Sequence, residues 1–191
     1  HDEPTGPLIA WSGGFDAEDP FARDPRVWSP KALDALAERC REITRSWSND
    51  HALLLRPHAR HILGDLNRCT RFVREVCESG PRPGTIGLAL DPVGLLEPSM
   101  LRAAPDHLER IFGLLASRCR VLILTDLCEP EGEITEDDPE FIALTPCPVD
   151  AGLLDASLLA DLIRRHLPLE TPIYLPFPDA AAQVAALDRH R

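Results

Sequence analysis

The chain has few aromatic residues, and it has no apolar run long enough to cross a membrane. Phe, Trp and Tyr together make up 5% of its 191 residues, and Met occurs once. A membrane-spanning helix needs about 20 consecutive apolar residues, far more than any run here supplies. Basic residues are also scarce, with 20 against 31 acidic ones and a net charge of −11. Because nucleic-acid-binding proteins normally present a basic face, we expect neither a nucleic-acid partner nor a membrane partner.

Several sequence signatures of known sites are missing as well. The chain contains no phosphate-binding Gly-rich loop, no Gly-x-Ser-x-Gly turn and no dinucleotide-binding fingerprint. Its six cysteines include no Cys-x-x-Cys pair and do not resemble a secreted disulfide framework, so a reducing cytoplasm is the expected location. Cys128 and Cys147 flank an acidic loop over 128–152. A metal site at these two thiols is the weaker alternative to ordinary buried cysteines.

Five apolar runs, each closed by polar residues, Gly or Pro, are the main positive signal. Runs of four to eight apolar residues with β-branched members are typical of strands buried on both faces, as in parallel sheets. Polar residues at the carboxyl ends of such strands are where α/β proteins place their sites. The runs are Pro7–Gly14, Ala52–His58, Thr85–Pro92, Arg120–Leu127 and Pro172–Pro178.

Segments with helical periodicity separate these runs. Ser29-Pro30 predicts a helix start with an N-cap and a proline in the first turn, and Asp155 and Asp179 predict two further N-caps. A second helix is expected over about 63–78, and a third over about 98–118 that Pro105 divides into a turn and a main helix. The prediction is a single α/β domain over 1–191 with about five strand–helix units.

The number of units falls short of a closed barrel. A complete eight-unit (β/α) barrel takes roughly 250 residues, so this chain lacks about two or three units. Two interpretations stay open: the sheet is open, or the chain holds the later units of a TIM-barrel-like protein whose amino-terminal units lie upstream of His1. In the second case something must cover the exposed barrel edge.

A basic cluster follows the second predicted strand. Arg56, His58, Arg60 and His61 could hold a phosphate or a carboxylate, with Arg56 forming paired charge-assisted hydrogen bonds. The alternative is that Arg56 forms a structural ion pair with Asp91 or a neighbouring acid, while the histidines are solvated.

Two aspartates and a tryptophan also lie at strand ends. Asp91 and Asp126 could provide general acid–base catalysis if their environments separate their pKa values. They could equally order the loops or cap the helices that follow. Trp11 could form an apolar wall for a sugar ring, or it could simply be packed.

The order of these motifs resembles the sugar phosphate isomerase/epimerase family of xylose isomerase-like TIM barrels. The resemblance rests on Trp11-Ser12-Gly13-Gly14 after the first strand, Ile86-Gly87-Leu88-Ala89-Leu90-Asp91, Ile123-Leu124-Thr125-Asp126 and the segment 146–155. It implies the later units of such a barrel and proton transfer next to the carbonyl of a sugar or sugar phosphate. Asp91 and Asp126 would then be the catalytic residues, and Arg56, His58 and Trp11 would bind the substrate.

The family's divalent-metal site is degenerate here. The positions where the resemblance implies metal ligands hold Arg56, Gly94, Leu124 and Pro176, and the matching carboxylates are Asp91 and, in part, Asp126. Because such a cation needs several converging oxygen or nitrogen donors, we expect no metal and no cofactor.

Two functions of different classes therefore stay open. The first is a sugar or sugar-phosphate isomerase/epimerase. The second is a non-catalytic relative that uses the same fold as a binding or assembly module, with a protein partner or a second copy covering the open edge.

Overall fold

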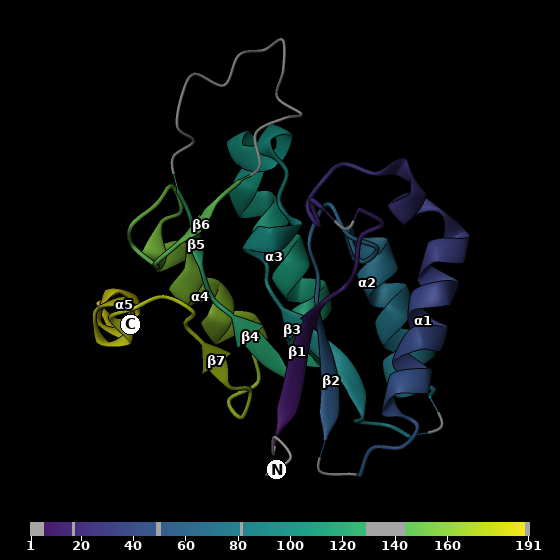
Figure 1. Ribbon diagram of the computed structural model, residues 1–191. Helices are drawn as coiled ribbons and strands as arrows, with labels where there is room; N and C mark the ends of the chain where they lie inside the picture. The colour runs from purple at the N-terminus through teal and green to yellow at the C-terminus, as the bar shows by residue number, and fades with distance from the viewer. Residues whose placement is uncertain (1–5, 17, 49–50, 81, 129–143, 190–191) are drawn as a thin grey trace. The chain divides into compact units, whose positions relative to one another are not determined.

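The computed structural model of the chain (Figure 1) describes residues 6–16, 18–48, 51–80, 82–128 and 144–189. These residues form two compact units. The first comprises the chain up to Leu90 together with Arg118–Arg120, and the second comprises Asp91–Ser117 and the chain from Val121 onward. The acidic stretch 129–138, predicted to be part of a long loop, lies outside the described residues.

The first unit is built on three parallel strands, β1 (Pro7–Trp11), β2 (Ala52–Arg56) and β3 (Ile86–Leu90). All five residues of β3 are buried, as are the first four of β2. This confirms the prediction that their uninterrupted apolar runs are covered on both faces. The register sets Trp11 beside Arg56, so the carboxyl ends of β1 and β2 lie together.

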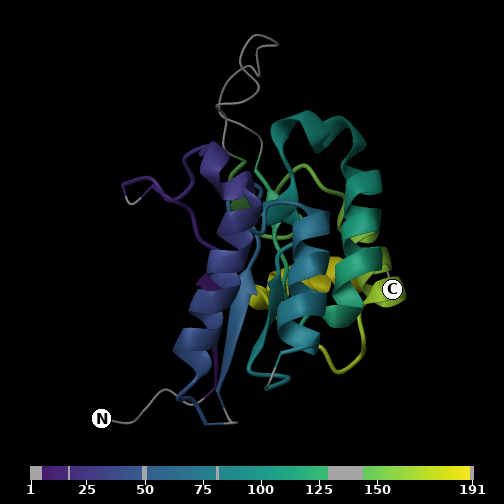
Figure 2. The same cartoon turned by 90° about the vertical axis from the view of Figure 1, so that its right-hand side faces the viewer.

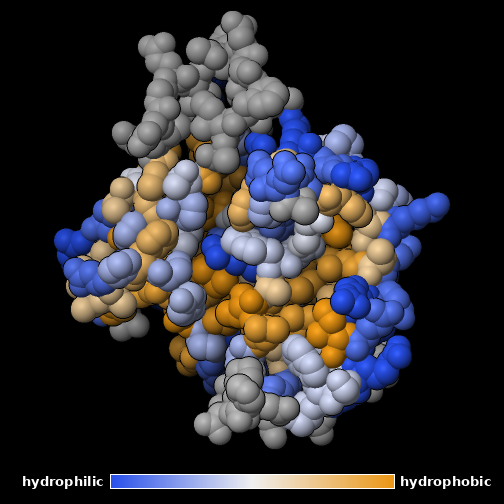
Figure 3. Space-filling view, viewed as in Figure 1, coloured by the Kyte–Doolittle hydropathy of each residue, from blue (hydrophilic) through white to orange (hydrophobic). Residues whose placement is uncertain are grey.

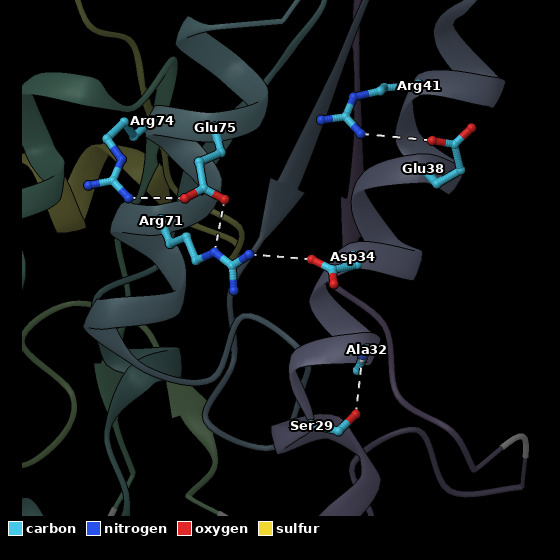
Figure 4. A network of polar contacts seen from close by, with 8 residues as sticks. All are labelled: Ser29, Ala32, Asp34, Glu38, Arg41, Arg71, Arg74 and Glu75. Atoms are coloured by element: carbon cyan, nitrogen blue, oxygen red, sulfur yellow. Dashed lines mark hydrogen bonds and ion pairs between the residues drawn. The ribbon is translucent and has the colours of Figure 1, made fainter.

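Two helical segments of this unit lie side by side, as Figure 2 shows. Helix α1 (Pro30–Thr44) starts as predicted, with Ser29 Oγ accepting from the Ala32 amide at 3.2 Å. Helix α2 (Leu66–Phe72) continues as the π-helix η2 (Val73–Glu78). Arg71 joins the two segments by contacting Asp34 at 3.4 Å and Glu75 at 2.8 Å (Figure 4). Such exposed ion pairs contribute little stability individually, so the buried apolar faces hold the helices.

The loop after β1 contains a short 3-10 helix, η1 (Pro25–Trp28), that the sequence analysis did not predict. Asp24 caps it by accepting from the Arg26 amide at 2.8 Å. Arg68 of α2 holds it in place, because its guanidinium donates to the carbonyls of Val27 at 2.9 Å and Ile62 at 3.3 Å. The loop after β1 and the segment after β2 are therefore fixed to the same side chain.

Strand β1 is an edge strand whose apolar side chains reach solvent. Leu8 is 53% exposed and Ile9 is 39% exposed, although neighbouring residues of a strand point to opposite faces. Among the described strands only β2 pairs with it within this unit. Apolar residues gather on the face around β1 in Figure 3. An uncharged strand that is apolar on both faces is an unusual edge.

The second unit pairs β4 (Val121–Ile123) with β7 (Ile173–Tyr174) in parallel. The turn η4 (Pro98–Ala103) leads into α3 (Ala104–Leu115), with Pro105 in its first turn, as predicted. Helices α4 (Ala156–His166) and α5 (Ala180–Asp188) start at the predicted caps Asp155 and Asp179. Helix α4 packs on both α3 and α5. Parallel strands joined by helices confirm the α/β fold class.

A short antiparallel pair follows β4, and the sequence analysis missed it. Strand β5 (Asp126–Leu127) pairs with β6 (Pro146–Cys147), which places Asp126 opposite Cys147. The fourth strand was predicted over Val121–Thr125, followed by Asp126. Strand β4 ends two residues earlier, at Ile123, and Asp126 begins β5. Within the described ranges, no helix has both the length and the apolar character required to span a membrane.

Candidate functional site

The carboxyl ends of β1 and β2 bring Trp11 and Arg56 into contact. The guanidinium carbon of Arg56 lies 4.1 Å from the centroid of the Trp11 ring, a cation–π geometry worth about 1 kcal/mol. The Ser12 amide donates to the Arg56 carbonyl at 3.0 Å and extends the strand pairing by one residue. Trp11 keeps 39% of its surface exposed. Trp11 therefore provides a flat, partly exposed surface, and the positive charge of Arg56 lies on it.

His58, His61 and Phe21 complete what we call the aromatic–arginine cluster, together with Trp11 and Arg56. Phe21 stacks on His61 with ring centroids 5.1 Å apart, and its edge meets His58 at 4.8 Å. Trp11 contacts both histidine rings, at 5.8 Å from His58 and 5.3 Å from His61. Phe21 was missed by the sequence analysis, since no spacing rule connects it to the strand ends.

Both histidines of the cluster are neutral at physiological pH. Burial, together with the smaller effects of the nearby His61, Arg60 and Arg56, lowers the pKa of His58 to about 3. Burial also lowers the pKa of His61, against the opposing effect of its hydrogen bond to the Pro20 carbonyl. His61 is 1% exposed. The predicted basic cluster therefore carries its positive charge on arginine alone, and the alternative of solvated histidines is wrong for His61.

The hydrogen bonds fix the tautomer of each ring. Nδ1 of His58 accepts from the Arg60 amide at 3.1 Å, so its proton is on Nε2. Nε2 of His61 lies 3.0 Å from the Pro20 carbonyl, which can only accept, so His61 also carries its proton on Nε2. The cluster thus offers an N–H donor at His58.

In the second unit, Asp126 is fully buried and its carboxylate accepts three backbone hydrogen bonds. Oδ1 accepts from Leu127 at 2.6 Å and from Leu154 at 2.9 Å, and Oδ2 accepts from Gly152 at 3.0 Å. Burial raises the pKa of Asp126 although each of these bonds lowers it. Such contacts are typical of a carboxylate that orders the loop after it. Loop ordering is the alternative to acid–base catalysis that the sequence analysis left open for Asp126.

Asp91 is also buried, with 2% of its surface exposed. Its Oδ1 accepts from the Gly94 amide at 3.0 Å, at the start of the 3-10 turn η3 (Val93–Leu95). Asp91 therefore caps the turn that follows β3. An acid–base role for Asp91 and Asp126 stays a prediction.

Comparison with known proteins identifies the fold. No protein-family model and no curated protein sequence matches the chain. Among solved structures, the probable 3-DHS dehydratase AsbF involved in petrobactin synthesis from Bacillus anthracis is similar over 97% of this chain and 62% of its own. The TM-score is 0.54 and the identity 11%. A xylose isomerase-like TIM barrel protein from Mycobacterium smegmatis, solved in complex with magnesium, is similar over 94% of this chain and 60% of its own, with a TM-score of 0.52 and 14% identity.

The chain therefore has an α/β fold that corresponds to part of a TIM barrel. It spans about 60% of the length of these two proteins, in line with the predicted shortfall of strand–helix units. At this level of identity the likeness concerns the fold and leaves substrate and reaction open.

The described residues do not fit a divalent-metal site. Among them, no group of three or more His, Cys, Asp or Glu side chains could hold a metal ion. Arg56, at a position where the resemblance implies a glutamate ligand, is a cation packed on Trp11. Cys147 ends β6 and Cys128 directly follows β5, where Cys128 Sγ lies 3.8 Å from the Pro146 carbonyl. Two thiols alone are too few for a structural zinc site.

We expect the purified protein to carry no stoichiometric metal. Asp91→Asn should leave the metal content unchanged, because Asp91 caps a turn and too few donors converge to offset the dehydration of Mg²⁺, Mn²⁺ or Zn²⁺. Elemental analysis of the wild type and of this variant measures the metal content of each protein. About one equivalent of Mn²⁺ or Zn²⁺ that disappears in Asp91→Asn would contradict the prediction.

Proposed function

We propose that the chain binds a sugar phosphate or a sugar acid at the aromatic–arginine cluster. The observation that carries this proposal is the Arg56 guanidinium stacked on Trp11 at the carboxyl ends of two neighbouring parallel strands. The guanidinium lies over the ring, and a guanidinium is the side-chain group that pairs best with both oxygens of a phosphate or carboxylate. The exposed part of Trp11 offers an apolar surface for a sugar ring.

The reaction we propose is isomerisation or epimerisation by proton transfer next to a carbonyl. One carboxylate takes a proton from the carbon beside the carbonyl, and a protonated carboxyl gives a proton to the carbonyl oxygen, which forms an enediol. A proton then returns to one enediol carbon while the hydroxyl on the other carbon gives its proton to the carboxylate that the acid became, which re-forms a carbonyl and restores both groups. Asp91 and Asp126 are the candidate groups. In support, burial raises the pKa of Asp126, the direction that a proton donor requires.

Arg56→Ala should weaken the binding of D-fructose 6-phosphate by about 100-fold, since a charge-assisted bidentate contact contributes about 3 kcal/mol. Binding of unphosphorylated D-fructose should change much less. Calorimetric titration of both sugars measures this, with Arg39→Ala on the exposed face of α1 as the matched control. Equal losses for both sugars would contradict anion recognition by Arg56.

Catalysis is tested by incubating the protein with these sugars in deuterated water. Deuterium uptake at the carbon beside the carbonyl, lost when Asp91 and Asp126 are both changed to Asn, would support the isomerase. Label uptake that persists in the double variant would exclude these aspartates as the acid–base groups.

A second candidate is a non-catalytic binding or assembly module. Two observations favour it: the Asp126 carboxylate is engaged by three backbone amides, and β1 presents an apolar edge that suits a protein partner or a second copy. Absence of label uptake, combined with self-association in sedimentation experiments, would favour this candidate over the enzyme.

A further inference from the structure

Within the described residues of the first unit, two buried polar atoms have no hydrogen-bond partner. They are Ser12 Oγ and His61 Nδ1, on side chains that are 0% and 1% exposed. Because an unpaired buried polar atom is destabilising, native proteins nearly always pair such atoms, with a protein group, an ordered water or a bound ligand.

His61 belongs to the aromatic–arginine cluster, and Ser12 directly follows Trp11 of that cluster in the chain. His61 contacts Trp11, the residue before Ser12. The residue after Ser12 is also tied to this segment, since the Gly13 carbonyl accepts from the Ile62 amide at 3.0 Å. Ser12 therefore lies on a backbone stretch whose neighbours on both sides contact residues 61 and 62. The same stretch follows β1, where Trp11 packs on Arg56.

The chemistry of His61 Nδ1 defines what it can bind. Because Nε2 carries the proton that is donated to Pro20, Nδ1 holds a lone pair and can only accept. An ionised phosphate or carboxylate oxygen has no hydrogen to give to this lone pair. A hydroxyl group has one, and its oxygen can also accept from Ser12 or from Nε2–H of His58.

We propose that Ser12 and His61 bind a hydroxyl group of the ligand, so that the site selects polyhydroxylated molecules. This inference rests on the proposed function. It assigns two groups of the ligand to different residues of the site. The anionic group lies on Arg56, and a hydroxyl group donates to His61 Nδ1. His61 thereby becomes a residue that determines specificity.

Two substitutions of His61 distinguish the role of Nδ1 from the role of Nε2. The terminal nitrogen of Gln is as many bonds from Cβ as Nε2, so His61→Gln can keep the hydrogen bond to Pro20 while losing the acceptor at the Nδ1 position. The side-chain oxygen of Asn matches Nδ1 instead, so His61→Asn keeps the acceptor and loses the bond to Pro20. His51→Gln, in the loop after α1, is the matched control.

The experiment measures the affinity of each variant for D-fructose 6-phosphate, gluconate, D-xylose and inorganic phosphate. His61→Gln should bind the first three about tenfold more weakly than the wild type and inorganic phosphate equally well. His61→Asn should retain most of the affinity. Ser12→Ala should also weaken sugar binding about tenfold, yet raise the melting temperature of the ligand-free protein, since it removes an unpaired buried hydroxyl.

The remaining outcomes distinguish this inference from the proposed function. If the wild type binds these sugars and His61→Gln binds them equally well, the inference is wrong and the proposed function stands. If the wild type binds inorganic phosphate through Arg56 but no hydroxylated probe, the inference is also wrong. Failure of every probe to bind the wild type would overturn both.

Discussion

Acidification from about pH 6.5 to pH 4 is expected to lower the free energy of unfolding by about 3 kcal/mol through His58 alone. Burial in the aromatic–arginine cluster lowers the pKa of this histidine from 6.5 to about 3 in the folded protein. Between these two pH values the unfolded chain binds one more proton than the folded chain, so stability falls as pH falls. Above about pH 6.5 both states are neutral at His58, and its contribution is constant.

His58→Phe is the variant that isolates this effect. Phe keeps a ring among Trp11, Phe21 and His61 but does not titrate, so the stability of the variant should depend less steeply on pH, by up to about 1.4 kcal/mol per pH unit. The comparison with the wild type is needed because other groups titrate too. The pKa of His61 is lowered and adds to the trend, whereas the raised pKa of Asp126 opposes it.

Urea unfolding at several pH values measures the slope, and NMR titration of the imidazole protons measures the pKa directly. The His58 signals should not move above about pH 4. Signals that shift near pH 6.5, with equal slopes for the two proteins, would show that His58 is solvated and would remove the basis for a neutral donor in the site.

The predictable part of the fold is the part set by local chemistry. The start of α1 follows from Ser29 and a proline that suits the first helical turn, and Asp155 and Asp179 mark α4 and α5 in the same way. Strands β2 and β3 were predictable because uninterrupted apolar runs of that length favour strands covered on both faces. The run of β1 predicts the same burial, which is wrong, because β1 lies at the edge with Leu8 and Ile9 exposed. The pairing of β5 with β6 could not be predicted, because strands of two residues are too short to show a periodic pattern.

The site was predictable in position and less so in chemistry. The sequence places Trp11, Arg56 and Asp126 at strand ends. The charge of His58, however, depends mainly on its burial, and Phe21 of the loop after β1 packs against its ring. Likewise, Asp126 accepts from Gly152 and Leu154, 26 and 28 residues away along the chain. Both properties depend on which loop packs over a strand end, and no local pattern specifies that.

Asp126→Ala is expected to destabilise the protein by about 3 kcal/mol or more, because it leaves three backbone N–H groups without their acceptor in a buried position. Asp161→Ala on the exposed face of α4 is the matched control. Asp161 forms an exposed ion pair with Arg164, one turn away, so its loss should cost less than about 0.5 kcal/mol. Chemical denaturation of the three proteins at neutral pH provides the measurement.

Asp126→Asn then separates the structural role of this carboxylate from a catalytic one. An amide has one oxygen acceptor, and its NH₂ group faces at least one of the three backbone donors. If Asp126 orders the loop at 152–154, the variant should lose roughly half as much stability as Asp126→Ala. A purely catalytic carboxylate would behave differently: the variant would be as stable as the wild type and would lose deuterium exchange into the sugar. That result would show that the three amide contacts contribute little, and it would make Asp126 the acid–base group of an active isomerase.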